Sequence, residues 1–126
     1  MTARDLTVLV DVSLITCVVQ RGRGDAVVAA AQEAGASGAT TNYGFGTGMR
    51  ERLGILGLAV DVEKEIVSVL AADDDVNRIF ERMYFAGELD VPGMGVIYIT
   101  RLDKAATYIP RDVLDRIRDE DAARSS

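Results

Sequence analysis

A glycine-rich stretch, Gly44-Phe45-Gly46-Thr47-Gly48, is the first place in the sequence where ligand chemistry can be expected. Glycines let backbone amides approach and encircle an anion, because no Cβ stands in the way. The stretch lacks the lysine and hydroxyl pair of a Walker loop, and no helical pattern follows it. A flexible surface loop explains the same letters, so the stretch predicts an anion site only in combination with other elements.

A lone lysine, Lys64, stands between Glu63 and Glu65 in an otherwise apolar segment. If the segment is a strand, alternation sends Lys64 to the face opposite the two glutamates. A lysine on an apolar face needs an anion, which is either a carboxylate of the protein or a phosphate of a ligand. The alternative is a set of solvated charges at a strand edge.

A third candidate is Pro92-Gly93-Met94-Gly95, whose closely spaced glycines precede a β-branched run and can present amides to a phosphate. A plain turn is the competing interpretation. Arg50 and Arg52 lie in the glycine-punctuated segment 44–57, where they can meet a partner protein or a ligand carboxylate, or stay solvated.

Composition argues against several other functions. The chain has no histidine and one cysteine, Cys17, in an apolar run, so the commonest general base and a thiolate metal cluster are both missing. No G-x-S-x-G elbow occurs, and we therefore expect no enzyme and no prosthetic group. The net charge of −6 disfavours nucleic acid. The run Leu6 to Val19 is interrupted by polar residues and predicts a strand in a cytoplasmic protein, not a signal peptide or membrane span.

Hydrophobic periodicity predicts one domain over residues 1–126 with alternating strands and helices. The first helix is expected to be capped by Asp25 and ended by Gly35, and the second to start at Asp73–Asp75 and end before Gly87. The apolar stripe of the second helix repeats at i, i+3, i+4, i+7 and i+8 and consists of Val76, Ile79, Phe80, Met83 and Tyr84. The expected strands are Leu14–Gln20, Ala39–Tyr43, Leu58–Leu70 and Val96–Arg101, and the tail 111–126 is charged.

This order, β-α-β-β-α-β, is that of an α+β, ferredoxin-like sandwich with an antiparallel sheet and both helices on one face. The other sheet face is then left apolar and exposed, so we expect a homo-oligomer. A doubly wound α/β sheet is the alternative, but it needs helices on both faces.

In this order and spacing, the elements resemble the PII superfamily of signal-transduction proteins over about residues 14–109. The matching motifs are Gly35-Ala36-Ser37-Gly38-Ala39-Thr40 before the second strand, Gly46-Thr47-Gly48 at the start of the T-loop (44–57), Val62-Glu63-Lys64-Glu65-Ile66-Val67, and Pro92-Gly93-Met94-Gly95-Val96 as the B-loop.

The resemblance implies a homotrimer with adenine nucleotide in three intersubunit clefts, and a T-loop that regulates a partner transporter or metabolic enzyme. A transporter partner implies recruitment to the membrane without insertion. The residues that the resemblance assigns to the ligand are Gly46, Thr47, Gly48, Lys64, Gly93, Met94 and Gly95. On an extended loop, we expect Leu53, Ile55 and Leu56 to supply apolar anchors for the partner, and Arg50 and Arg52 to set the charge complementarity.

Departures from the family pattern concern the phosphate contacts. Val96 stands where the nitrogen regulators have a lysine after the B-loop glycine, and the expected C-terminal arginine pair is missing. Either Arg101, Lys104 and Arg111 substitute, or the ligand carries fewer phosphates than ATP, as in ADP, AMP or a cyclic nucleotide. Tyr43 precedes the loop, so uridylylation is not expected. The alternative functions are a CutA-like oligomer that binds a metal or no ligand, and a small carboxylate-based enzyme.

Overall fold

The computed structural model describes residues 6–46 and 62–107, together with 111–113, 115–116, 119 and 123, which are helical. Most of the predicted T-loop, from Thr47 to Gly57, lies outside the described residues. The described elements, in chain order, are β1 (Val8–Leu9), β2 (Val12–Gln20), α1 (Gly24–Glu33), β3 (Thr40–Gly46), β4 (Val62–Ala72), α3 (Val76–Ala86), β5 (Gly95–Arg101) and β6 (Ala105–Ala106).

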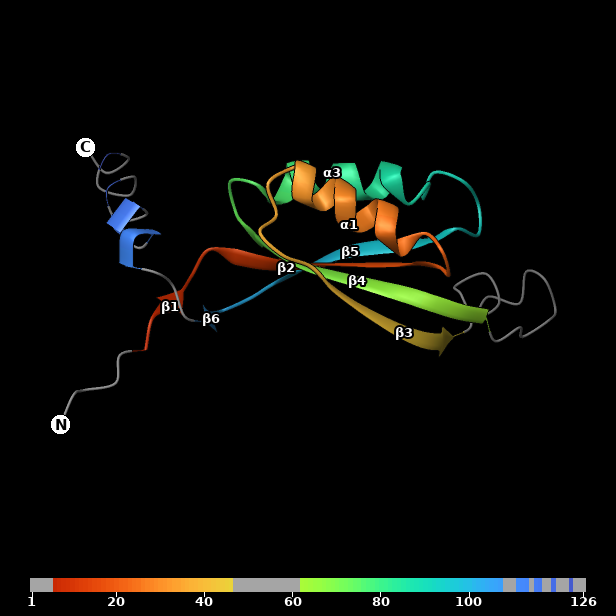
Figure 1. The fold of residues 1–126 in the computed structure, drawn as a ribbon, viewed down its shortest axis with the longest axis horizontal. Coiled ribbons are helices and arrows are strands. Elements are labelled where there is room, and N and C mark those ends of the chain that lie inside the picture. The colour runs from red at the N-terminus through yellow and green to blue at the C-terminus, as the bar shows by residue number, and fades with distance from the viewer. Residues whose placement is uncertain are drawn as a thin grey trace.

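The main sheet has the strand order β3-β4-β2-β5, and each neighbouring pair is antiparallel. Helices α1 and α3 both cover the same face of this sheet (Figure 1). The predicted β-α-β-β-α-β order of a ferredoxin-like fold is therefore confirmed, and the doubly wound alternative is excluded because its helices would lie on two faces.

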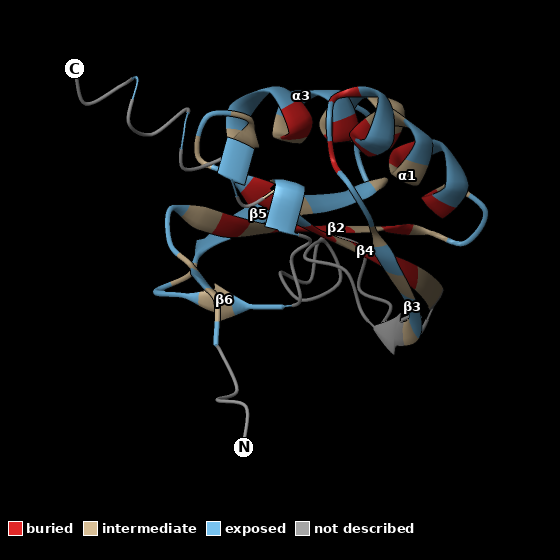
Figure 2. Cartoon of the chain, turned by 60° about the vertical axis from the view of Figure 1, so that its left-hand side comes forward, coloured by how far each residue is buried: buried red, intermediate tan, exposed pale blue. Residues whose placement is uncertain are grey.

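The core lies between the sheet and the two helices (Figure 2). Alternate residues of β2 and β4 point into it, as period-two geometry requires. The fully buried large side chains are Ile15, Cys17 and Val19 of β2, Val67 and Val69 of β4, Val27 of α1, and Ile79 and Met83 of α3. Cys17 is buried as predicted, and burial raises the pKa of its thiol from 9.0 to about 12.

Both helices end where the sequence predicts. Ala34 is the C-cap of α1 and is followed by Gly35 with φ +114°, while Gly87 is the C-cap of α3. The predicted N-cap of α1 is wrong, because Arg23 holds that position without a side-chain cap and Asp25 lies in the first turn. The acceptor for the first amide of α1 is instead the carboxylate of Glu65, in β4.

The face of the sheet opposite the helices carries a partly exposed apolar surface, which we call the open face. Two of its side chains, Leu70 of β4 and Tyr98 of β5, are 49% and 48% exposed. Ile66 lies on the same face as Leu70 and is half-buried, and Val96 shares the face with Tyr98. The expectation of an uncovered apolar sheet face is thus met in the single chain.

The N-terminal run does not form one continuous strand. Asp11 has φ +58° and separates β2 from β1, which pairs antiparallel with β6 as a two-stranded ribbon beyond the end of the main sheet (Figure 1). A backbone in the left-handed region breaks the extended conformation at that residue. In the described part of the chain, no helix is long and apolar enough to cross a membrane.

Candidate functional site

One end of the main sheet brings together three of the predicted ligand elements. In the strand register, Lys64 of β4 lies between Gly44 of β3 and Gln20 of β2, and Gly46 pairs with Val62. Adjacent strands lie about 4.8 Å apart, so this row of backbone is about 10 Å wide from Gly44 to Gln20. The glycine-bearing end of β3 is therefore a direct neighbour of Lys64.

The loop that follows α3 reaches the same end of the sheet. Gln20 Nε2 donates a hydrogen bond of 3.2 Å to the carbonyl oxygen of Gly93. Gly93 has φ +82° and Gly95 has φ +148°, conformations that favour glycine. A Cβ on Gly95 would lie 2.0 Å from the carbonyl oxygen of Val18, so glycine at this position lets the loop approach β2 closely.

The predicted alternation along β4 is observed. The Glu65 side chain is on the helix side of the sheet, where it contacts the start of α1, and Lys64 is therefore on the open face. Lys64 is half-buried and forms no ion pair with any residue in the described ranges. A cation without a carboxylate partner beside glycine-bearing backbone is suited to an anionic ligand.

Glu65 has a role that sequence reasoning missed. Glu65 is only 7% exposed, and its carboxylate accepts hydrogen bonds from the backbone N–H groups of Gly22, at 2.6 Å, and Gly24, at 2.8 Å. Gly24 is the first residue of α1 and Gly22 precedes it, so the carboxylate lies at the positive dipole end of the helix, which favours a negative charge. A Cβ at Gly24 would lie 1.9 Å from Glu65 Oε2, so any larger residue there would force the Glu65 side chain to shift. The carboxylate thus replaces the N-cap that was expected from Asp25.

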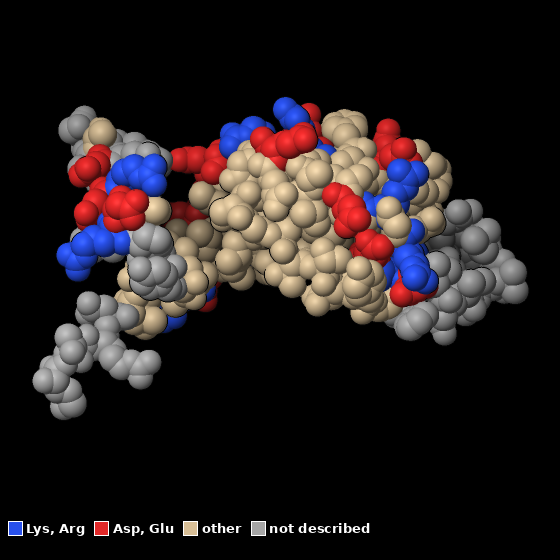
Figure 3. All heavy atoms as spheres, viewed as in Figure 1, with Lys and Arg blue, Asp and Glu red and all other residues tan. Residues whose placement is uncertain are grey.

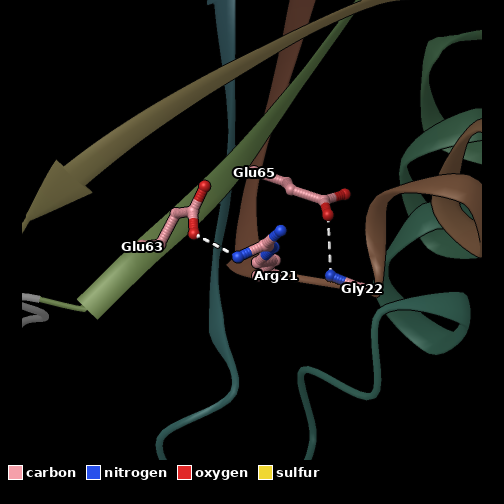
Figure 4. Close-up of polar contacts among 4 residues, drawn as sticks. All are labelled: Arg21, Gly22, Glu63 and Glu65. Atoms are coloured by element: carbon pink, nitrogen blue, oxygen red, sulfur yellow. Dashed lines mark hydrogen bonds and ion pairs between the residues drawn. The ribbon is translucent and has the colours of Figure 1, made fainter.

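Two ion pairs flank this contact. Arg21 Nη1 lies 2.8 Å from Glu63 Oε2, and Arg23 Nη2 lies 2.5 Å from Glu88 Oε2 (Figure 4 draws the first pair together with Glu65 and Gly22). Acidic and basic side chains accordingly alternate at the end of the molecule where β2 turns into α1 (Figure 3). The only signal in the sequence is the alternation of arginine and glycine at residues 21–24, a pattern that predicts a turn and does not reveal these contacts.

Arg101 is placed apart from the other candidates. It pairs with Ser13 in the register, seven residues along β2 from Gln20, and lies 3.6 Å from Asp73 Oδ2. At about 3.3 Å per residue, Ser13 and Gln20 are about 23 Å apart along β2. Within one chain, Arg101 therefore does not meet Lys64 or Gly93–Gly95.

The other candidates divide by position. Gly46, Lys64, Gly93, half-buried Met94 and Gly95 lie at the same end of the sheet. The ligand candidates Thr47 and Gly48 and all the predicted partner residues lie outside the described residues: Arg50, Arg52, Leu53, Ile55 and Leu56. Among described residues, no group of three or more histidine, cysteine, aspartate or glutamate side chains is arranged to hold a metal ion.

Comparison with known proteins gives a structural likeness only. No protein-family model matches the sequence, and no curated protein matches it. Among solved structures, the chain is similar to Arabidopsis thaliana PII bound to citrate, with a TM-score of 0.60 and 17% identity over 75% of this chain and 79% of that chain. The expected resemblance is thus confirmed at the level of architecture: the chain has the ferredoxin-like fold seen in PII.

Proposed function

We propose that this chain is a PII-like signalling protein that binds an adenine nucleotide, or a related small anion, and passes the ligand state to a partner protein. The observation that carries the proposal is the meeting of Gly44–Gly46, Lys64 and the Gly93–Gly95 loop at one end of a PII-type sheet. Backbone amides at glycines together with one lysine are a common way to hold phosphate oxygens.

The charge distribution favours an anion at this position. Glu63 and Glu65 are both engaged, by Arg21 and by the α1 amides, so neither of them neutralises Lys64. The similar Arabidopsis protein was solved with citrate, which is a small polyanion. The proposal extends this ligand class to the present chain and names ADP, AMP, ATP or a cyclic nucleotide as its members.

The proposal includes a homotrimer in which each site is shared between subunits. The open face, with Leu70 and Tyr98 half-exposed, supports burial against another copy. Arg101, at the far end of β5, would reach the ligand of a neighbouring subunit. The segment 44–57 would then present Arg50, Arg52, Leu53, Ile55 and Leu56 to a transporter or a metabolic enzyme, and the chain itself would catalyse no reaction.

The proposal can be tested by calorimetric titration of the protein with each of several ligands. These are ATP, ADP, AMP, cyclic mononucleotides, cyclic dinucleotides and bicarbonate. Lys64→Ala should weaken binding about tenfold or more, since a hydrogen bond to a charged group contributes roughly 1.5–3 kcal/mol. Arg82→Ala removes an exposed positive charge from α3 and should leave affinity unchanged. Failure of every nucleotide to bind, or equal losses in the two variants, would refute the proposed site.

A further inference from the structure

The turn between β2 and α1 contacts two segments that are far apart in the sequence. Every residue from Gln20 to Gly24 forms a polar contact with one of them: Arg21, Gly22 and Gly24 contact Glu63 or Glu65 at the start of β4. Gln20 and Arg23 contact Gly93 and Glu88, in the loop that follows α3. We call residues 20–24 the bridging turn.

We propose that the bridging turn couples the start of β4 to the 87–95 loop, so that a change at either one alters the order of the other. Among the described residues, no hydrogen bond or ion pair joins the two segments directly, whereas each is bound to the bridging turn. Contacts to the two segments are interleaved along five consecutive residues, so the turn cannot shift to follow one segment without straining its contacts to the other.

The strengths of the contacts differ on the two sides. On the β4 side, the nearly buried Glu65 carboxylate holds two backbone amides, and such charge-assisted bonds are short and strong. On the loop side, Arg23 and Glu88 are 40% and 47% exposed and make a weaker, solvent-screened pair. Glu88 has φ +56°, an unfavourable conformation for glutamate that the surrounding contacts must maintain. The loop is therefore the side that yields first.

This coupling deepens the proposed function. Its consequence for ligand binding depends on that function being correct. An anion held by Lys64 and the Gly93–Gly95 backbone would contact both coupled segments at once. Arg23 and Glu88 would then be positioning residues, which set the loop without touching the ligand. The coupling itself is a property of the single chain and can be measured with no ligand present.

Amide hydrogen exchange on the full chain tests the coupling in both directions. Glu88→Gln, on the loop side, should speed exchange at the Gly22 and Gly24 amides by about 1.5- to 5-fold, the effect expected from loss of an exposed ion pair. These two amides are bonded to Glu65 and not to Glu88, so faster exchange there would report coupling. Glu65→Gln should speed exchange at the Met94 amide, which is bonded to Val91. If Glu65→Gln does not fold, Glu63→Gln replaces it and should act in the same direction.

A matched control separates coupling from general loss of stability. Asp75→Asn breaks a comparable exposed ion pair with Arg78 at the start of α3 and should leave Gly22 and Gly24 unchanged relative to the core amides. Exchanging the charges, Arg23→Glu with Glu88→Arg, should restore the original rates. Unchanged Gly22 and Gly24 rates in Glu88→Gln, or equal acceleration in Asp75→Asn, would overturn the coupling.

Titration of Glu88→Gln with ADP then distinguishes the two proposals. Coupled exchange without nucleotide binding in the original chain would leave the coupling standing and refute the ligand. Nucleotide binding without coupled exchange would leave the proposed ligand standing and refute the coupling. If both hold, Glu88→Gln should weaken ADP binding by a similar 1.5- to 5-fold, and the charge-exchanged variant should recover it.

Discussion

Substitution of Gly95 by alanine tests the packing of the 87–95 loop against β2. The new Cβ would lie 2.0 Å from the carbonyl oxygen of Val18, and contacts under 3.0 Å essentially never occur. The loop must therefore move by about 1 Å at the point where β5 begins to pair with β2. Gly95 also has φ +148°, which an alanine adopts only with strain.

The expected cost follows from these two effects. Backbone strain at a disfavoured φ costs about 1–3 kcal/mol, and weakening a ladder hydrogen bond costs about 1 kcal/mol. Gly95→Ala should therefore lower the free energy of unfolding by about 2–4 kcal/mol. With a urea m-value of about 2 kcal/mol/M, the midpoint should fall by about 1–2 M.

Urea unfolding followed by circular dichroism measures this shift, at one fixed protein concentration because self-association would alter the midpoint. Gly38→Ala is the matched control, since its added Cβ meets nothing within 4 Å and its φ lies outside the left-handed range. The control should leave the midpoint unchanged or raise it slightly. A Gly95→Ala midpoint equal to that of the control would show that the close approach of the loop to β2 is not what holds this end of the sheet.

Three further predictions concern the core, the turn and the open face. Burial raises the pKa of the Cys17 thiol from 9.0 to about 12, so the unfolded chain loses this proton at a lower pH than the folded chain. The free energy of unfolding should therefore fall as pH rises from 9 to 12, by up to about 1.4 kcal/mol per pH unit. Urea titrations at several pH values should show that Cys17→Ala removes this contribution to the pH dependence. Gly24→Ala should displace the Glu65 carboxylate, because the new Cβ would lie 1.9 Å from Oε2. Calorimetry should then show a thermal midpoint lower by several degrees. An unchanged midpoint would contradict the role of Glu65 as the acceptor at the start of α1. Tyr98→Asp places a charge on the open face and should reduce the mass measured by light scattering to that of one chain. Tyr43→Asp, on the helix side of the sheet, should leave the mass unchanged. A mass unaffected by Tyr98→Asp would argue against association through the open face.

Local patterns predicted the helices well. The stripe that includes Val76, Ile79 and Met83 defines α3, and Gly35 marks the end of α1, because helical periodicity and C-terminal glycines act within a few residues. The β-α-β-β-α-β order of the elements along the chain was also predicted from the sequence, whereas the order of the strands within the sheet was not. Alternation along β4 also placed Lys64 and Glu65 on opposite faces correctly.

Long-range contacts are what the sequence could not provide. Asp25 was the wrong cap because Glu65, 41 residues from Gly24, supplies the acceptor from another strand. The break at Asp11 and the β1–β6 ribbon depend on pairing between the two ends of the chain. Arg101 was grouped with Lys64 by residue type alone, and the antiparallel register separates the two within one chain.

The outer position of β5 has a consequence for how the protein must be handled and made. This strand, Gly95-Val96-Ile97-Tyr98-Ile99-Thr100-Arg101, is rich in β-branched and aromatic residues, lacks proline, and ends the main sheet with almost every residue exposed. Natural edges of this kind are usually shortened, charged or covered, because they recruit other strands indiscriminately. A single copy therefore presents an unpaired strand edge that other strands can join, and aggregation of the isolated chain should increase with protein concentration.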